Sequence, residues 1–159
     1  MAAKKKKAAK KAVKKTAKRP ASRSKVRRRQ PETLRLRQLA PSFTVNDANR
    51  SLAWYTNVLG FVVKDRWENN GVFLGAELRA GDLSLMIGQD DFKKGKDRVY
   101  GVGVRIYCRT AQDIDLLAKE IKARGGTLDH EPEDQPWGER DFGVTDPDGY
   151  KITISSMRH

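Results

Sequence analysis

The sequence predicts an α+β domain in which one β-α-β-β-β module occurs twice. Two amphipathic helical patterns are each preceded by a short stretch of alternating apolar residues and followed by three further strands. The patterns share one offset, because Leu52 and Leu117 are 65 residues apart and so are Gly60 and Gly125. Two helices spaced this unevenly are too few for a doubly wound parallel sheet, so mostly antiparallel pairing is favoured.

The first half begins with a short alternating strand, after which residues 46–59 are expected to form a helix. Asn46 or Asp47 can cap this helix and Gly60 can end it. Its apolar face consists of Ala48, Leu52, Tyr55 and Leu59. Asn70-Gly71 is a strong hairpin signal between the first two of the strands that follow. These strands are expected at residues 61–68, 72–79 and 82–88.

The second half repeats this order, with a helix expected at residues 111–124. Thr110 can cap it, with Asp113 three residues on, and Gly125-Gly126 can end it. Its buried stripe consists of Ile114, Leu117 and Ile121. Strands are expected near residues 127–130, 138–145 and 150–156. Asp146-Pro147-Asp148-Gly149 joins the last two as a turn, since Pro presets φ and Gly tolerates positive φ.

Alternation gives each strand an apolar face and a polar face. The positions expected to face the helices are Phe43, Val45, Leu83, Leu85, Ile87, Val102, Val104, Ile106, Ile152 and Ile154, and Cys108 ends the same strand as Ile106. The opposite face is expected to carry Ser42, Thr44, Ser84, Met86, Gly103, Arg105, Tyr107, Lys151 and Thr153. This second set suits a wall that touches either solvent or a ligand.

Charge divides the chain into a tail and a body. Residues 1–30 contain fifteen Lys or Arg residues and no acidic residue, so the remainder has 18 basic and 20 acidic residues and a formal charge of −2. We therefore expect a Lys/Ala/Arg-rich tail at residues 1–33 and one domain at 34–159. The tail has almost no large apolar residue, which predicts disorder in isolation.

The composition also bears on compartment. One cysteine excludes an internal disulfide and fits a reducing compartment. No apolar run has the length of a membrane span, and the tail lacks the apolar core of a secretory signal. We expect a cytoplasmic protein without a membrane partner, which would associate with the nucleoid if its tail binds nucleic acid.

Two segments carry a family resemblance. Residues 46–61 include the ending Tyr55-Thr56-Asn57-Val58-Leu59-Gly60-Phe61, and residues 136–154 form the predicted closing hairpin. In this order they resemble the first helix and last hairpin of the vicinal oxygen chelate superfamily, which includes glyoxalase I, bleomycin-resistance proteins and extradiol dioxygenases. The resemblance covers residues 34–156. It implies that the two modules form a curved sheet around a binding cleft.

The resemblance also implies where metal-dependent members hold their ion. The ligand positions fall near Ala40, Met86, Gly103 and Thr153, and none of these is a good ligand for a divalent metal. Other candidates are Glu77, Gln89 and His130, and His159 is the C-terminal residue. No catalytic constellation or phosphate loop stands out, so we expect neither catalytic residues nor a cofactor.

The resemblance favours a metal-free small-molecule binding protein like the bleomycin-resistance proteins, acting as a homodimer whose clefts involve both chains. Aromatic side chains of a cleft can stack on planar ligands and arginines can pair with anionic groups, although packing or solvation explains such residues equally well. The candidate ligand-binding residues are Ser42, Thr44, Trp67, Met86, Arg105, Tyr107, Trp137, Arg140 and Thr153. The alternative is a metal-dependent glyoxalase-like lyase or isomerase, or a dioxygenase.

The tail is a second functional element. Its basic residues between positions 4 and 19 are Lys4, Lys5, Lys6, Lys7, Lys10, Lys11, Lys14, Lys15, Lys18 and Arg19. Such a run favours phosphate backbones through counterion release, without reading sequence. An anionic membrane surface, a nuclear localisation signal and a solubilising extension are the alternatives.

Overall fold

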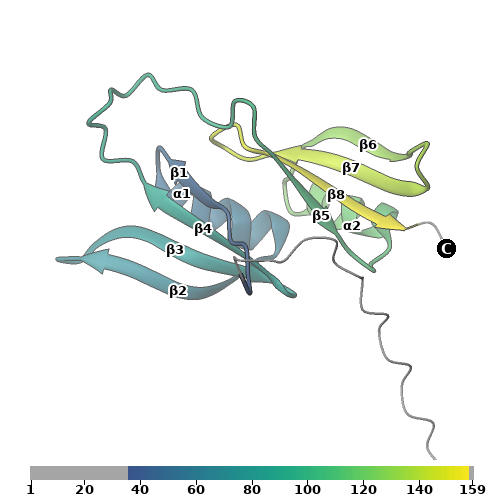
Figure 1. Ribbon diagram of the computed structural model, residues 1–159, viewed down its shortest axis with the longest axis horizontal. Helices are drawn as coiled ribbons and strands as arrows, with labels where there is room; N and C mark the ends of the chain where they lie inside the picture. Colours follow the sequence, from purple (N-terminus) through teal and green to yellow (C-terminus); the bar gives the residue numbers. More distant parts are fainter. Residues whose placement is uncertain (1–35, 158–159) are drawn as a thin grey trace, which may run out of the picture. The chain divides into compact units, whose positions relative to one another are not determined.

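Each half of the chain folds as strand, helix and three strands, which confirms the predicted α+β class (Figure 1). The computed structural model describes residues 36–157, and the expected tail at residues 1–33 lies outside the described residues. The first module contains β1 (Ser42–Val45), α1 (Ala48–Ala53), the π-helical η1 (Trp54–Leu59), β2 (Val62–Asn69), β3 (Val72–Ala80) and β4 (Leu83–Gln89). The second contains β5 (Arg105–Arg109), α2 (Ile114–Ala123), β6 (Leu128–Asp134), β7 (Glu139–Thr145) and β8 (Lys151–Met157).

The two modules have the same topology. Their four-stranded sheets have the orders β1-β4-β3-β2 and β5-β8-β7-β6. In each sheet the first strand pairs in parallel with the last, and the other neighbours are antiparallel. Figure 1 shows each helix covering one face of its own sheet, so the opposite face of each sheet is left without a helix. Among the described residues no helix is long and apolar enough to cross a membrane.

The first helix follows its sequence signals closely. The Asp47 carboxylate accepts hydrogen bonds from the backbone N–H groups of Asn49 and Arg50, both at 3.0 Å, and so caps α1. The predicted helix 46–59 is α-helical only up to Ala53, after which it widens into η1. Gly60, at φ +83°, ends it in the left-handed conformation expected of a terminal glycine.

The second helix begins later than predicted, and its cap is Asp113, so the prediction of Thr110 is wrong. The Thr110 backbone N–H still donates to Ser155 O at 2.8 Å, which keeps Thr110 attached to the end of β8. The helix therefore starts three residues on, where the Asp113 side chain accepts from the Leu116 N–H at 2.8 Å.

The strand before α2 is also shorter than expected. Val102 and Val104 are exposed and lie outside β5, so their expected position against the helix is wrong. Gly101 and Gly103 have φ values of +70° and +72°, which turn the chain away from an extended strand before Arg105. The valines do alternate in the sequence, but the positive φ values of the neighbouring glycines prevent this segment from forming a strand.

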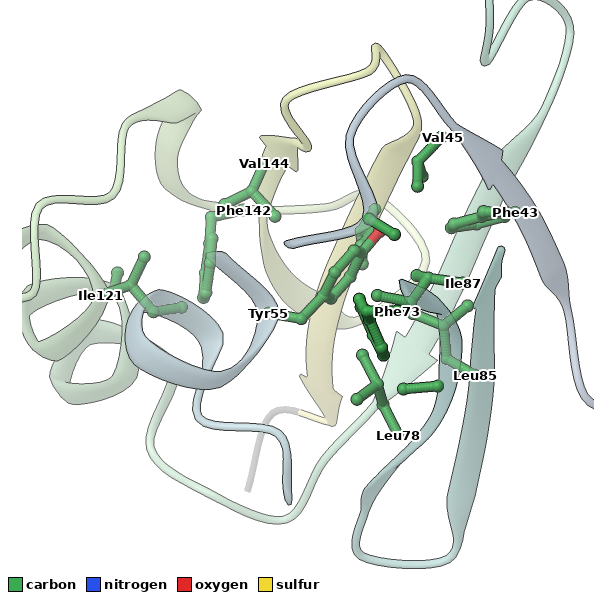
Figure 2. Packing of buried hydrophobic residues seen from close by; sticks show 14 of the residues in the cluster. Phe43, Val45, Tyr55, Phe73, Leu78, Leu85, Ile87, Ile121, Phe142 and Val144 are labelled. Carbon is green, nitrogen blue, oxygen red and sulfur yellow. The ribbon is translucent and has the colours of Figure 1, made fainter. Parts of the chain in front are cut away.

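One hydrophobic core serves both modules. Phe43, Val45 and Ile87 come from the first module, whereas Ile121 and Phe142 come from the second. Figure 2 shows the ring of Tyr55 between these two groups of side chains. Burial of this many apolar side chains in a continuous cluster is the main stabilising contribution to the fold.

The predicted turn at residues 146–149 joins the modules as well as two strands. The Asp146 carboxylate accepts a hydrogen bond from Tyr55 Oη at 2.9 Å, and Asp148 accepts one from Ser51 Oγ at 2.9 Å. Burial raises the pKa of Tyr55 and the pKa of Asp146. The turn therefore carries two buried carboxylates that hold the first helix, a role that the turn signal alone does not indicate.

Candidate functional site

The face of the second sheet that α2 does not cover carries a connected group of polar side chains. On β5, Ile106 and Cys108 pack against the core, so Arg105, Tyr107 and Arg109 point the other way. The same alternation on the neighbouring strands places four more side chains on this face, namely Glu139, Asp141, Thr153 and Ser155. We call these seven residues the polar face.

Glu139 is the centre of the polar face. The residue is 3% exposed, and its carboxylate accepts hydrogen bonds from Tyr107 Oη, from Arg109 Nε at 2.7 Å and from Trp137 Nε1 at 3.2 Å. The hydrogen bond from Tyr107 holds the pKa of Glu139 below its usual range, and Arg109 and Trp137 act in the same direction. Glu139 is therefore a buried carboxylate kept charged by its neighbours.

Tyr107 and Trp137 flank this carboxylate with aromatic surface. Tyr107 is 42% exposed and Trp137 is 63% exposed, although both donate to the same buried group. Burial raises the pKa of Tyr107, and the hydrogen bond to Glu139 raises it further, so its hydroxyl keeps the proton. Two exposed aromatic side chains fixed by one buried anion form a wall suited to a planar ligand.

Asp141 lies next to Glu139 on β7 and is also 3% exposed. Its Oδ1 accepts from Gln135 Nε2 at 3.0 Å. In the part of the chain that the structure describes, one His/Cys/Asp/Glu group has ligand atoms within 4.8 Å of one another, and it consists of His130, Glu133 and Asp141. The Gln135 amide also donates to Glu133, at 3.2 Å, so the side chains present already bridge these two carboxylates.

The positions at which the resemblance implies a metal do not supply a donor set. Ala40 and Gly103 have no side-chain donor, and Met86 offers only a thioether. The Thr153 hydroxyl accepts a hydrogen bond from Arg105 Nη1 at 2.8 Å. A divalent ion needs imidazole or carboxylate ligands here, so the residues present do not fit one.

The other metal candidates have separate structural partners. Gln89 accepts from the Ala48 N–H at 3.0 Å and donates to Asn46 O at 2.8 Å, so its amide holds the start of α1. Glu77 pairs with Lys64 at 2.7 Å. Neither hydrogen bonds nor ion pairs connect Glu77, Gln89 and His130 with one another in the described residues.

The predicted ligand-binding residues divide into three groups. Arg105, Tyr107, Trp137 and Thr153 lie on or beside the polar face. Four others lie on the first sheet, namely Ser42, Thr44, Trp67 and Met86. Ser42 is opposite Met86, and Thr44 is exposed. Trp67 lies across Gly75. Arg140 lies on the other face of β7 and pairs with Asp115 of α2 at 2.8 Å.

Sequence reasoning missed Glu139, Asp141, Arg109 and Ser155. The signal was their spacing, because each lies two residues from a neighbour on the same face of its strand. Two acidic residues at alternate positions of an otherwise apolar strand indicate a buried polar cluster. Their mutual partners required the cross-strand register, which the sequence alone does not supply.

Comparison with known proteins identifies the fold. The family model described as the glyoxalase/bleomycin resistance protein/dioxygenase superfamily matches residues 35–154. Among solved structures, TioX from Micromonospora sp. ML1 is 20% identical, with a TM-score of 0.60 over 77% of this chain and 98% of its own. A superfamily member from Sphaerobacter thermophilus is 25% identical, with a TM-score of 0.59 over 76% and 98%. UcmS2 is 18% identical, with a TM-score of 0.63 over 77% and 98%. No curated protein matches the chain.

Proposed function

Because the chain belongs to the glyoxalase/bleomycin resistance protein/dioxygenase superfamily, we propose that it binds a small molecule on the polar face and sequesters it without a metal ion. The observation that carries the proposal is Glu139, buried and charged between the exposed rings of Tyr107 and Trp137. Fixed polar groups beside exposed aromatic surface are typical of small-molecule sites. Arg105 and Lys151 extend the same face toward an open cavity of about 480 Å³ beside residues 100–105.

The proton affinities of the central pair support binding without chemical conversion. A general acid or base works best with a pKa near the working pH. Here the pKa of Tyr107 is raised and the pKa of Glu139 is lowered, so both move away from neutrality. The pair is suited to holding a ligand's hydrogen-bonding groups in place and poorly suited to transferring protons.

The proposal predicts ligand binding in the presence of a chelator. We expect a thermal-shift screen of planar compounds, run with EDTA, to give hits whose affinity falls about fivefold in Trp137→Ala, since loss of an aromatic contact costs about 1 kcal/mol. Leu116→Ala removes a similarly exposed side chain from α2 and should leave binding unchanged. A stoichiometric divalent metal in the purified body would contradict the proposal and favour the glyoxalase-like lyase or dioxygenase instead.

We also propose a homodimer in which the first sheet meets a second copy of the chain. Apolar side chains gather on β2 and β3 with large exposed fractions, and they include Val62, Val72 and Leu74. α1 contacts β3 and β4, so β2 is left without a covering helix. We expect sedimentation equilibrium to give a dimer mass that Val62→Lys together with Val72→Lys converts to the monomer mass. A monomer at all concentrations would rule this arrangement out.

Residues 1–30 support a separate proposal, namely that the tail binds nucleic acid without reading its sequence. Fifteen basic residues are concentrated there, whereas the remainder has a formal charge of −2. Phosphate neutralisation by such a segment releases condensed counterions, which drives binding to any duplex. This role would place the protein in the cytoplasm beside the nucleoid.

A further inference from the structure

An apolar groove lies on the helix side of the sheets, and of the polar face only Arg109 reaches its rim. It has a volume of about 480 Å³ and is bordered by the end of η1, the start of β4, α2 and β8. Its main lining residues are Leu59, Phe61, Leu83, Cys108, Leu117 and Ile121. A smaller cavity shares Phe61, Leu83 and Cys108 with it and is also lined by Pro41, the residue before β1. The groove therefore borders the point where the described chain enters the first sheet.

The segment that leads into β1 carries two largely exposed leucines. Leu36 is 75% exposed and Leu39 is 83% exposed. The backbone bond nearest this segment joins Met86 N–H to Pro41 O at 2.8 Å. Pro41 has no N–H, so one ladder bond is missing at this residue; the described β1 begins at Ser42, and the ladder can resume only before Pro41.

The register of β1 shows where this segment would lie if the strand continued. Ser42 is opposite Met86 on β4, so three residues earlier Leu39 would be opposite Leu83. β1 pairs with β4 only from Met86 onward, which leaves the edge of Leu83–Leu85 free on that side. Phe43 faces the helices, and alternation gives Leu39 the same face. Leu83 lines the groove, so a continued strand would direct Leu39 into it.

Charge supports the same placement. Arg37 lies two residues before Leu39 and shares its face, and Asp82 lies in the turn directly before β4. Both Gly81 and Asp82 line the groove. The segment therefore brings an arginine as well as a leucine toward a groove whose rim carries a carboxylate.

We propose that residues 37–40 dock along the first residues of β4 and insert Leu39 into the groove. The described arrangement is the undocked state, in which the groove is open and Leu39 is exposed. Burial of the leucine favours docking, whereas ordering of the segment opposes it, so the two states interconvert. Docking would attach residues 37–40, which follow the basic tail, to the body.

Cys108 provides a direct test, because it is the one cysteine of the chain and it lines the groove. The rate of its reaction with DTNB (an aromatic disulfide that reports thiol access) should be measured in the full-length protein under native conditions. Leu39→Ser should raise this rate about tenfold, the change in population that burial of one leucine side chain supports. Leu36→Ser is the matched control, because alternation puts Leu36 on the opposite face and its rate should equal that of the wild type.

Leu36→Ser should leave the melting temperature of the body unchanged, whereas Leu39→Ser should lower it slightly, by the free energy of docking. Equal rates in the wild type and Leu39→Ser would overturn the proposal, and so would an equal rise in both variants. If the protection of Cys108 from DTNB increased with protein concentration, the docked segment would belong to a second copy of the chain. That result would also overturn the proposal. Arg37→Ala should raise the rate in the same direction as Leu39→Ser, through loss of the partner of Asp82.

Discussion

Removal of residues 1–30 is expected to abolish binding to duplex DNA. The remaining chain has a formal charge of −2 and should repel a polyanion, whereas the tail carries fifteen positive charges. With the tail present, log K should fall linearly with log salt concentration by about 0.9 for each phosphate neutralised, or about 7 for about eight contacts. Fluorescence anisotropy over a salt series, with the full chain and a chain starting at Pro31, measures both quantities.

Two tail variants separate charge from sequence. Replacement of Lys4, Lys5, Lys6 and Lys7 by Gln should reduce the salt slope by about 3 to 4, because about one counterion is released per phosphate contact. A tail with the same composition in shuffled order should bind as the natural tail does, since phosphate contacts read no sequence. Equal affinity with and without residues 1–30 would show that the charge acts elsewhere.

Asp146→Ala is expected to cause the largest loss of stability among single substitutions at the module junction. The Asp146 carboxylate accepts from Tyr55 Oη at 2.9 Å, from the Asp148 N–H at 2.9 Å and from the Tyr150 N–H at 2.8 Å. Alanine leaves three donors without this acceptor in a buried setting, which costs about 3 kcal/mol or more. Urea unfolding should therefore show a lower midpoint with a similar m-value.

Two milder substitutions test the reason for this loss. Tyr55→Phe removes one donor and leaves the two backbone bonds to Asp146, so it should cost about 1 kcal/mol. Asp146→Asn keeps an acceptor oxygen, and burial already raises the pKa of Asp146, so the neutral amide should cost less than alanine. If all three variants unfold at the wild-type midpoint, the turn does not hold the modules together.

The repeated module could be predicted from the sequence because the signals for helices and turns are local. Helix stripes such as Ile114 to Ile121, and turns such as Asn70-Gly71, depend on residues a few positions apart. In the structure Asn70 and Gly71 have φ values of +50° and +76°, as that hairpin signal requires. The predicted modules, their mostly antiparallel pairing and the end of the first helix at Gly60 followed from such patterns, whereas the start of α2 did not.

The candidate site was less predictable because it depends on register between distant strands. Tyr107 and Glu139 meet across β8, and no pattern within either strand indicates that their side chains connect. Arg140 was chosen for its charge, yet its neighbour in space is Asp115 on α2. The residues that complete the polar face are recognisable only after the strands are aligned.

The most direct test of the central proposal is amide chemical-shift mapping of the full-length protein with a screening hit, recorded in EDTA. Binding on the polar face should shift the amide signals of β5, β7 and β8, with the largest changes near Tyr107, Glu139 and Thr153. Signals of the helix-side groove, such as those of Leu83 and Ile121, should stay in place. Shifts confined to that groove, or binding that disappears when EDTA is present, would contradict metal-free ligand binding on the polar face.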